Sequence, residues 1–287
     1  MRVRRPVVAG QFYPADRAGC VRMIEECLPQ RLPDGLPERI VAGVVPHAGW
    51  VYSGPTAAKV FAAIRSHSTP DTFVLLSAMH RWGAARPAVY TGEAWATPLG
   101  EAEVDADLAQ AVLDEGAGLL VDAPEAHAGE HSAEVQVPFI QHLFPGARLL
   151  PILVPPDEQA VAAGEVIAQT IAGAGKNVVV VGTTDLTHYG AMYYGFAPAG
   201  TGERALEWAR ANDEQVINLM LEMQAEKIVP ETAAHHNACG GGAIAATVAA
   251  ARTLGAQKGV LLEYTTSHHV RGHGPATDFV GYAAVVF

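Results

Sequence analysis

Two histidines stand where apolar segments of strand length end. His47 follows the apolar run from residue 40 to residue 45, and His80 ends the run that begins at residue 73. Beyond His47, Pro55 suits the first position of a helix, where a backbone N–H is not needed. A histidine between a strand and a helix lies where open α/β sheets gather ligand-binding and catalytic groups. The alternative is a loop histidine that is hydrogen-bonded to the backbone.

A third apolar run and a glycine-rich helix start carry further reactive side chains. Residues 177 to 181 lead into Asp185 and His188. Cys239 precedes three glycines and the helical pattern of residues 243 to 254. Free N–H groups and the partial positive charge of a helix start stabilise a thiolate over a thiol. Cys239 is therefore predicted to be a ligand or a nucleophile.

These residue types are typical of a metal site. Two neutral imidazoles, here His47 and His80, combined with one anionic ligand commonly hold a divalent metal. A thiolate from Cys239 in the anionic place favours iron(II), copper or zinc over magnesium. The residues lie far apart in the sequence, so spacing alone leaves a second interpretation open. In that interpretation they are unrelated residues at the edge of a sheet, and Cys239 is a packed side chain.

Composition limits the kinds of partner. The formal charge is −11 and there is no cluster of lysine and arginine, which argues against nucleic acid or an anionic membrane as the main partner. No apolar stretch reaches the roughly 18 residues of a membrane-spanning helix. The basic residues 1 to 6 are not followed by the apolar segment of a signal peptide. We therefore expect a cytoplasmic location.

Strand and helix patterns alternate along the 287 residues. This alternation predicts an α/β fold, a single three-layer α/β/α domain spanning residues 1–287, around a mixed, mostly parallel central sheet. The last two strands, residues 260 to 266 and 279 to 286, are expected to be antiparallel. An early helix carries Cys20 and Cys27 on one face, where they are predicted to be packing residues.

Several motifs together resemble the Memo family, whose bacterial and archaeal members are named AmmeMemoRadiSam system protein B. The resemblance covers nearly the whole chain, and it is the combination of motifs that is specific. The matching segments are Ala9-Gly10-Gln11-Phe12-Tyr13-Pro14, Val45-Pro46-His47-Ala48-Gly49, Glu130-His131-Ser132 with Glu134, Asp185 with His188, Cys239-Gly240 and Gly281-Tyr282-Ala283.

The resemblance implies a fold similar to that of class III extradiol ring-cleaving dioxygenases. It implies that His47 and His80 are metal ligands and that Cys239 stands where the dioxygenases have a glutamate. His188 would match their acid/base histidine, with Asp185 beside it. A thiolate is a strong donor that is itself oxidisable, so ordinary catechol cleavage does not follow. The family names also imply a functional link to radical-SAM and AMMECR-type proteins.

The remaining histidines are less clearly assigned. Glu130 and His131 either line the site or brace a helix start. The roles of two further groups stay open, the pair before Cys239 and the cluster near the C-terminus, which are His235, His236, His268, His269 and His273. We expect three others in polar settings to be exposed or capping residues, namely His67, His127 and His142.

The leading hypothesis is a metal-dependent redox enzyme in which iron(II), or alternatively copper, meets dioxygen or a small organic substrate. In it, His188 carries a proton and Asp185 orients that histidine or a bound water. A second hypothesis is a non-catalytic module that binds a peptide or a partner protein in the same cleft. Zinc-dependent hydrolysis is a third, because such ligands can lower the pKa of a bound water.

Overall fold

The structure is a computed structural model that describes residues 3–81, 83–193 and 195–287. Its strands are β1 (Val3–Arg4), β2 (Ala42–Val45), β3 (Thr72–Ser77), β4 (Ala88–Val89), β5 (Ala94–Thr97), β6 (Gly100–Glu103), β7 (Val121–Asp122), β8 (Arg148–Leu153), β9 (Val178–Thr183), β10 (His188–Tyr189), β11 (Val260–Thr266) and β12 (Phe279–Val286). Its α-helices are α1 (Arg17–Cys27), α2 (Trp50–His67), α3 (Ala106–Glu115), α4 (Val137–Leu143), α5 (Gln159–Gly173), α6 (Glu203–Leu221), α7 (Ala225–His235), α8 (Gly241–Thr253) and α9 (Ser267–Arg271). Short 3₁₀ turns, η1 (Pro124–His127) and η2 (Glu134–Gln136), precede α4.

A mixed sheet forms the centre of the molecule. Its strand order is β10-β12-β2-β9-β3-β8-β4-β7, and β11 pairs with β12. The central strands β2, β9, β3 and β8 are parallel to their neighbours, whereas β12 joins β2, and β4 joins β8, in the antiparallel sense. β11 and β12 are antiparallel, as predicted from the sequence.

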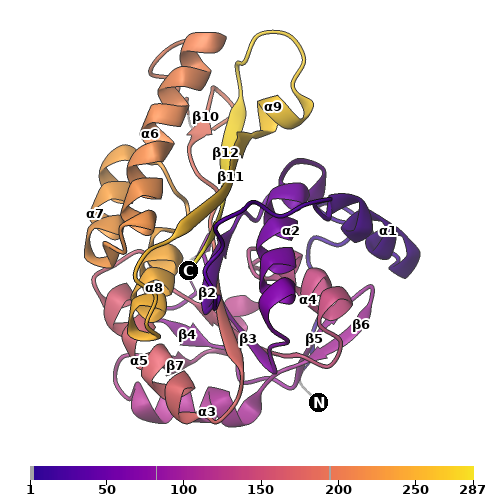
Figure 1. The fold of residues 1–287 in the computed structure, drawn as a ribbon, viewed down its shortest axis with the longest axis vertical. Helices are drawn as coiled ribbons and strands as arrows, with labels where there is room; N and C mark the ends of the chain where they lie inside the picture. The colour runs from indigo at the N-terminus through magenta and orange to yellow at the C-terminus, as the bar shows by residue number, and fades with distance from the viewer. Residues whose placement is uncertain (1–2, 82, 194) are drawn as a thin grey trace.

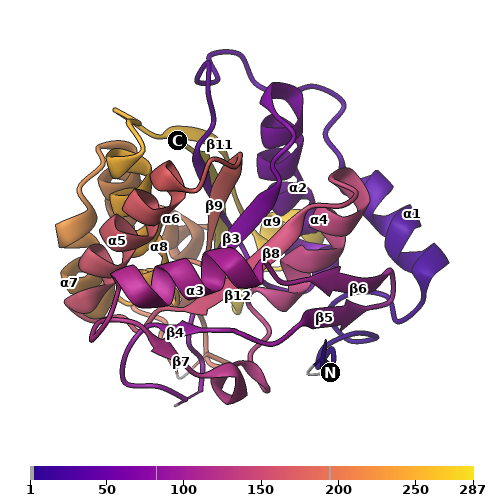
Figure 2. The same ribbon diagram turned by 90° about the horizontal axis from the view of Figure 1, so that it is seen from below.

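Helices cover both faces of this sheet (Figures 1 and 2). On one face, side chains of β3 such as Val74 and Leu76 pack with the alanine-rich helix α8 and with α5. On the other face, Phe73 and Leu75 of the same strand pack with α2 and α4. Successive side chains of a strand point to opposite faces, so a fully apolar strand supplies two cores. The predicted three-layer α/β/α architecture is confirmed.

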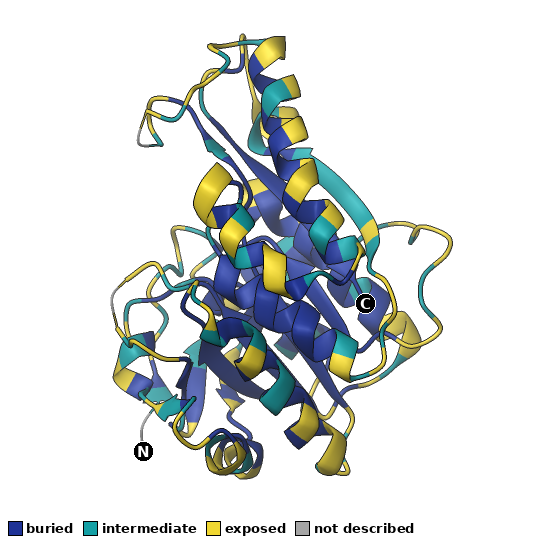
Figure 3. Cartoon of the chain, turned by 90° about the vertical axis from the view of Figure 1, so that its left-hand side faces the viewer, coloured by how far each residue is buried: buried dark blue, intermediate teal, exposed yellow. Residues whose placement is uncertain are grey.

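Helix α8 is buried along nearly its whole length (Figure 3). Small residues allow this close packing. A Cβ on Gly164 of α5 would lie 2.1 Å from the carbonyl oxygen of Ala246, and a Cβ on Gly182 of β9 would lie 2.1 Å from Oγ1 of Thr247. The glycines therefore let α8 approach both α5 and the sheet, which brings its N-terminus close to the ends of the central strands.

Helix α2 begins at Trp50, so the prediction that it starts at Pro55 is wrong. Trp50 is buried, its indole N–H donates to the carbonyl of Val135 at 2.9 Å, and its ring stacks on Tyr13. The N–H of Ser53 already donates to the carbonyl of Gly49. Tertiary packing of the tryptophan thus outweighs the preference of proline for the first helical position.

His127 is also placed differently from the prediction of an exposed or capping residue. It is fully buried, and its Nε2 lies 3.0 Å from the carbonyl oxygen of Ala88. Its ring packs edge-on against Tyr90 and Trp95. Its carbonyl accepts a hydrogen bond from the side chain of Arg4, so His127 helps to anchor β1. The sequence around His127 has the polar character of a loop, so it gave no indication of these contacts with distant residues.

Within the described ranges, no helix combines the length and the apolar character needed to cross a membrane.

Candidate metal centre

Three adjacent parallel strands deliver polar side chains to one edge of the sheet. His47 follows β2, Asp185 follows β9 and His80 follows β3. Because β9 lies between the other two strands, Asp185 enters between the two histidine loops. Its Oδ1 accepts a hydrogen bond of 2.7 Å from the backbone N–H of His47. The carboxylate thereby fixes the loop that carries the first histidine.

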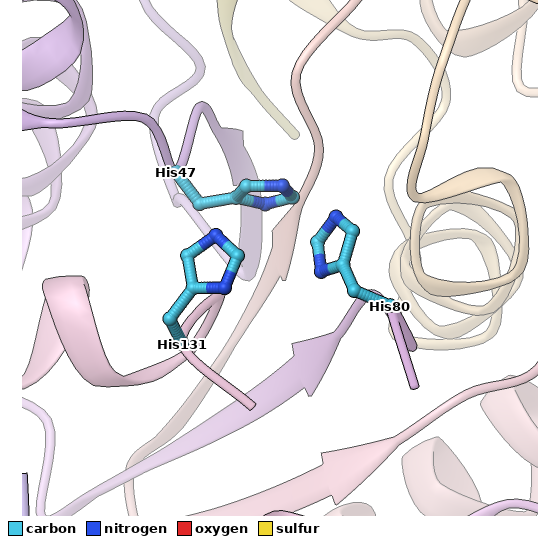
Figure 4. Close-up of side chains that lie close together, drawn as sticks. All are labelled: His47, His80 and His131. Carbon is cyan, nitrogen blue, oxygen red and sulfur yellow. The ribbon is translucent and has the colours of Figure 1, made fainter. Parts of the chain in front are cut away.

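His47, His80 and His131 form a compact cluster (Figure 4). Each offers one ring nitrogen, and these three atoms lie within 4.8 Å of one another. The ring of His47 meets the other two edge-on, with centroids 5.0 Å from His80 and 5.6 Å from His131. The rings of His80 and His131 stack with centroids 4.9 Å apart. The cluster can hold a metal ion.

Glu130 holds two of these histidines. Its carboxylate accepts backbone hydrogen bonds of 2.8 Å from His80, His131 and Ser132. Its Oε1 also lies 3.0 Å from Nδ1 of His80. Burial alone would raise the pKa of Glu130, but its hydrogen bonds with His80 hold that pKa well below the usual range. An ionised Glu130 directs the proton of His80 to Nδ1 and leaves Nε2 as the free donor atom.

Cys239 approaches the cluster from the loop before α8. Its Sγ lies 3.2 Å from Nε2 of His47 and accepts a 3.3 Å contact from the backbone N–H of Asp185. The N–H of Cys239 in turn donates to the carbonyl of Asp185 at 3.1 Å. Gly240, the next residue, permits this approach, because a Cβ there would lie 2.2 Å from the carbonyl oxygen of Thr183. The thiol is only partly buried.

The pKa values of two histidines in the cluster are shifted in opposite directions. Burial, followed by the charges of His80 and His131, lowers the pKa of His47 well below its usual value. Burial would lower the pKa of His80 as well, but hydrogen bonds to Cys239 and Glu130 raise it to about 10. A metal cation bound by His80 would likewise compensate the negative charge of the Glu130 carboxylate beside it.

His188 lies on a cleft beside the cluster. Its Nδ1 is 3.0 Å from the carbonyl oxygen of Leu186, which makes Nδ1 the donor and leaves Nε2 to accept a proton. Its ring meets Tyr193 edge-on at 5.3 Å. The cleft has a volume of about 650 Å³ and is lined by His80, His188, Cys239 and the apolar side chains Met192, Tyr193 and Phe196, among others.

The histidines that the sequence left open fall into two groups. His236 lines the cleft, has a left-handed backbone with φ of 50°, and packs against Phe196. Nδ1 of His235 lies 2.8 Å from a carboxylate oxygen of Glu231. The C-terminal group does not line the cleft, and of its members only His268 is partly covered, the exposed ones being His269 and His273.

The donor atoms of this cluster could hold a metal ion. Nδ1 of His47 is buried without a hydrogen-bond partner in the described part of the chain, and its Nε2 faces the sulfur. A ring with so little hydrogen bonding of its own is available to a ligand.

Comparison with known proteins agrees with this architecture. The family profile described as Memo-like protein matches residues 4–286. The chain belongs to the Memo family. A MEMO1 family protein of Thermococcus kodakarensis is 39% identical over 298 residues, with 99% of each chain covered. One from Methanopyrus kandleri is 36% identical, covering 99% of this chain and 98% of the relative. The resemblance inferred from the sequence motifs is confirmed.

A solved structure shares the fold of this Memo family member. It is an uncharacterized protein of Escherichia coli K12, with a TM-score of 0.54 and 13% identity, and the match covers 87% of this chain and all of that one. At this identity the likeness concerns the fold alone.

Sequence reasoning left open whether Glu130 and His131 line the site or brace a helix start, and the structure places both at the histidine cluster. Both belong to the Glu130-His131-Ser132 motif, which lies in a loop before α4 and follows no central strand. Strand ends therefore gave no sign of it. The signal that could have found it is the pair of carboxylates in this segment, Glu130 and Glu134, since buried carboxylates need several donors. Glu134 binds Arg4, Tyr13 and the N-terminal backbone.

Proposed function

We propose that this Memo family protein is a metal-dependent redox enzyme whose iron(II) or copper ion is held by His47, His80 and Cys239. The observation that carries the proposal is the approach of the Cys239 sulfur to 3.2 Å from Nε2 of His47, within a histidine cluster that can hold a metal. A thiolate ligand favours soft or borderline ions that change oxidation state.

The cleft also offers a proton acceptor and apolar walls for a small substrate. A redox-active ion held there would supply electrons and an open position for a small ligand. His188 accepts a proton at Nε2, because Leu186 occupies Nδ1. Asp185 helps to position His47, because its carboxylate accepts a hydrogen bond from the backbone N–H of that residue. Tyr193 and Phe196 provide apolar walls that exclude water from part of the cleft.

Metal analysis of protein purified without oxygen tests the proposal. We expect near-stoichiometric iron or copper in the wild type and a clearly lower content in Cys239→Ala, because the thiolate ligand is gone. The matched control is Cys20→Ala, which removes a buried thiol on α1 far from the strand ends. The loaded protein should consume oxygen with at least one member of a panel of phenols and reductants. Equal, substoichiometric metal in wild type and Cys239→Ala contradicts the proposal.

The exposed apolar rim of the cleft favours a second candidate, a module that binds a peptide or partner protein. Met192 on this rim is 81% exposed, and flexible methionine side chains are common on surfaces that bind peptides. A metal-loaded protein that consumes no oxygen with any compound, and that loses a peptide ligand on Met192→Ser, would select this candidate over the enzyme.

A further inference from the structure

We propose that His131 is an exchangeable ligand, which takes the place of Cys239 on a metal that His47 and His80 hold permanently. The inference rests on the metal site proposed above and adds a second coordination state to it. In one state the sulfur completes the site, and in the other a third imidazole completes it. The metal would then stay bound when the thiol is engaged elsewhere.

The first support is that His47 and His80 are common to two sets of donors. Their ring nitrogens form one group with a nitrogen of His131, within 4.8 Å. Nε2 of His47 is at the same time 3.2 Å from the sulfur of Cys239. A four-coordinate ion with an open position needs three protein ligands, so four candidate donors are one more than it requires.

The second support is that the His131 ring is oriented but has little bonding of its own. Its backbone N–H is fixed by Glu130 at 2.8 Å, and Phe12 packs against its ring edge-on at 5.0 Å. Nδ1 of the ring lies 3.5 Å from Oε1 of Glu130, which is too long for a strong hydrogen bond. Its side chain is 23% exposed, so the ring can turn toward the cluster without unpacking a core.

The third support is that one carboxylate braces both His80 and His131. Glu130 accepts the backbone N–H groups of both residues and the Nδ1 proton of His80. Carboxylates that hold metal-binding histidines in this way fix the ring orientation and raise its basicity. The segment is itself anchored, because Arg4 donates to the carbonyl of Glu130 and pairs with Glu134 at 2.8 Å.

The fourth support is that the sulfur has other partners. It accepts the backbone N–H of Asp185 at 3.3 Å and lies 3.5 Å from the carbonyl oxygen of the same residue. When the thiol keeps its proton and donates it to this carbonyl, it is not a thiolate ligand, and the imidazole supplies the third donor atom. Imidazole suits zinc, copper, iron and nickel, whereas thiolate prefers softer ions, so the exchange would also change the metal preference.

Cobalt(II) binding to four proteins tests the exchange, with the experiments done without oxygen. The proteins are the wild type, Cys239→Ala, His131→Ala and the double variant, and two quantities are measured for each. One is the dissociation constant of cobalt, and the other is the sulfur-to-cobalt charge-transfer absorption. Thermal unfolding of each metal-free protein reports whether it is folded. His131→Gln serves as a second variant that keeps a polar side chain if the alanine variant does not fold.

We expect the sulfur band in the wild type and in His131→Ala, and its loss in Cys239→Ala, where cobalt binding is weaker but still measurable. His131→Ala should weaken cobalt binding by no more than about threefold in the wild-type background, but by at least about thirtyfold in the Cys239→Ala background. His268→Ala in the Cys239→Ala background is the control for loss of a histidine outside the cleft, and it should leave the dissociation constant unchanged.

Equal effects of His131→Ala in the two backgrounds would overturn the exchange, whether those effects are large or absent. If the effects are equal but the wild type still shows the sulfur-to-cobalt absorption, only the exchange is refuted and the proposed metal site stands. Absence of the band from the wild type instead removes Cys239 from the ligand set, and both proposals with it. The two failures are therefore distinguishable in one experiment.

Discussion

A buried carboxylate on α6 should make the stability of this protein depend on pH near neutrality. Asp213 is fully buried and accepts hydrogen bonds of 2.9 Å from the N–H of Thr187 and from the hydroxyl of Tyr264. Burial is the largest influence on this group, and it raises the pKa of Asp213 from 3.8 to about 7. Thr187 adjoins His188, so the same carboxylate helps to position the cleft.

The sign follows from proton binding. Between pH 3.8 and pH 7 the folded protein keeps the proton of Asp213 and the unfolded chain has lost it, so stability falls as pH rises. The full difference is worth about 4 kcal/mol, of which about 2 kcal/mol is lost between pH 5 and pH 7. Asp213→Asn cannot titrate, and its amide can accept from Thr187 and donate to the hydroxyl oxygen of Tyr264.

Chemical unfolding of wild type and Asp213→Asn at several pH values checks this. The free energy of unfolding of the variant, minus that of the wild type, should rise by about 2 kcal/mol from pH 5 to pH 7. Taking the difference removes the contributions of other titrating groups, such as His80 and His127. Asp114→Asn, at an exposed site on α3, controls for loss of one charge. A difference that stays constant across this range would refute the reasoning.

Three further changes have defined consequences. Arg4→Ala leaves Glu134 buried without its cation and should lower the free energy of unfolding by about 3–5 kcal/mol, and a wild-type denaturation curve for the variant would contradict this. Gly182→Ala forces a methyl group against α8 and should cost about 1–3 kcal/mol, measured as a lower denaturation midpoint. Glu130→Gln removes the charge that orients His80 and should weaken metal binding by about 10–100-fold in a competition titration, whereas unchanged affinity would exclude that role.

Much of the fold follows from local patterns in the sequence. The runs before His47, His80 and Asp185 are apolar on both faces, as expected for central parallel strands covered by helices. Because neighbouring parallel strands end at the same edge of a sheet, strand ends were enough to gather these residues. The glycines after Cys239 likewise predicted a helix start, and α8 begins at Gly241.

What the sequence could not predict depends on contacts between distant segments. Helix α2 starts early because Trp50 binds the carbonyl of Val135, and His127 is buried because Ala88 accepts its ring nitrogen. His131 reaches the cluster because Glu130 and Arg4 tie its loop to the N-terminal strand. None of these partners can be read from spacing, since each pairing is set by the completed packing.

Anomalous scattering at the iron, copper and zinc edges, from a crystal of protein purified without oxygen, tests the central claim most directly. The account predicts one peak at the ends of β2 and β3, about 2.0 to 2.3 Å from ring nitrogens of His47 and His80 and from the sulfur of Cys239. A peak bound only by histidines outside this cluster, or no peak at any edge from protein that analysis shows to carry metal, would contradict it.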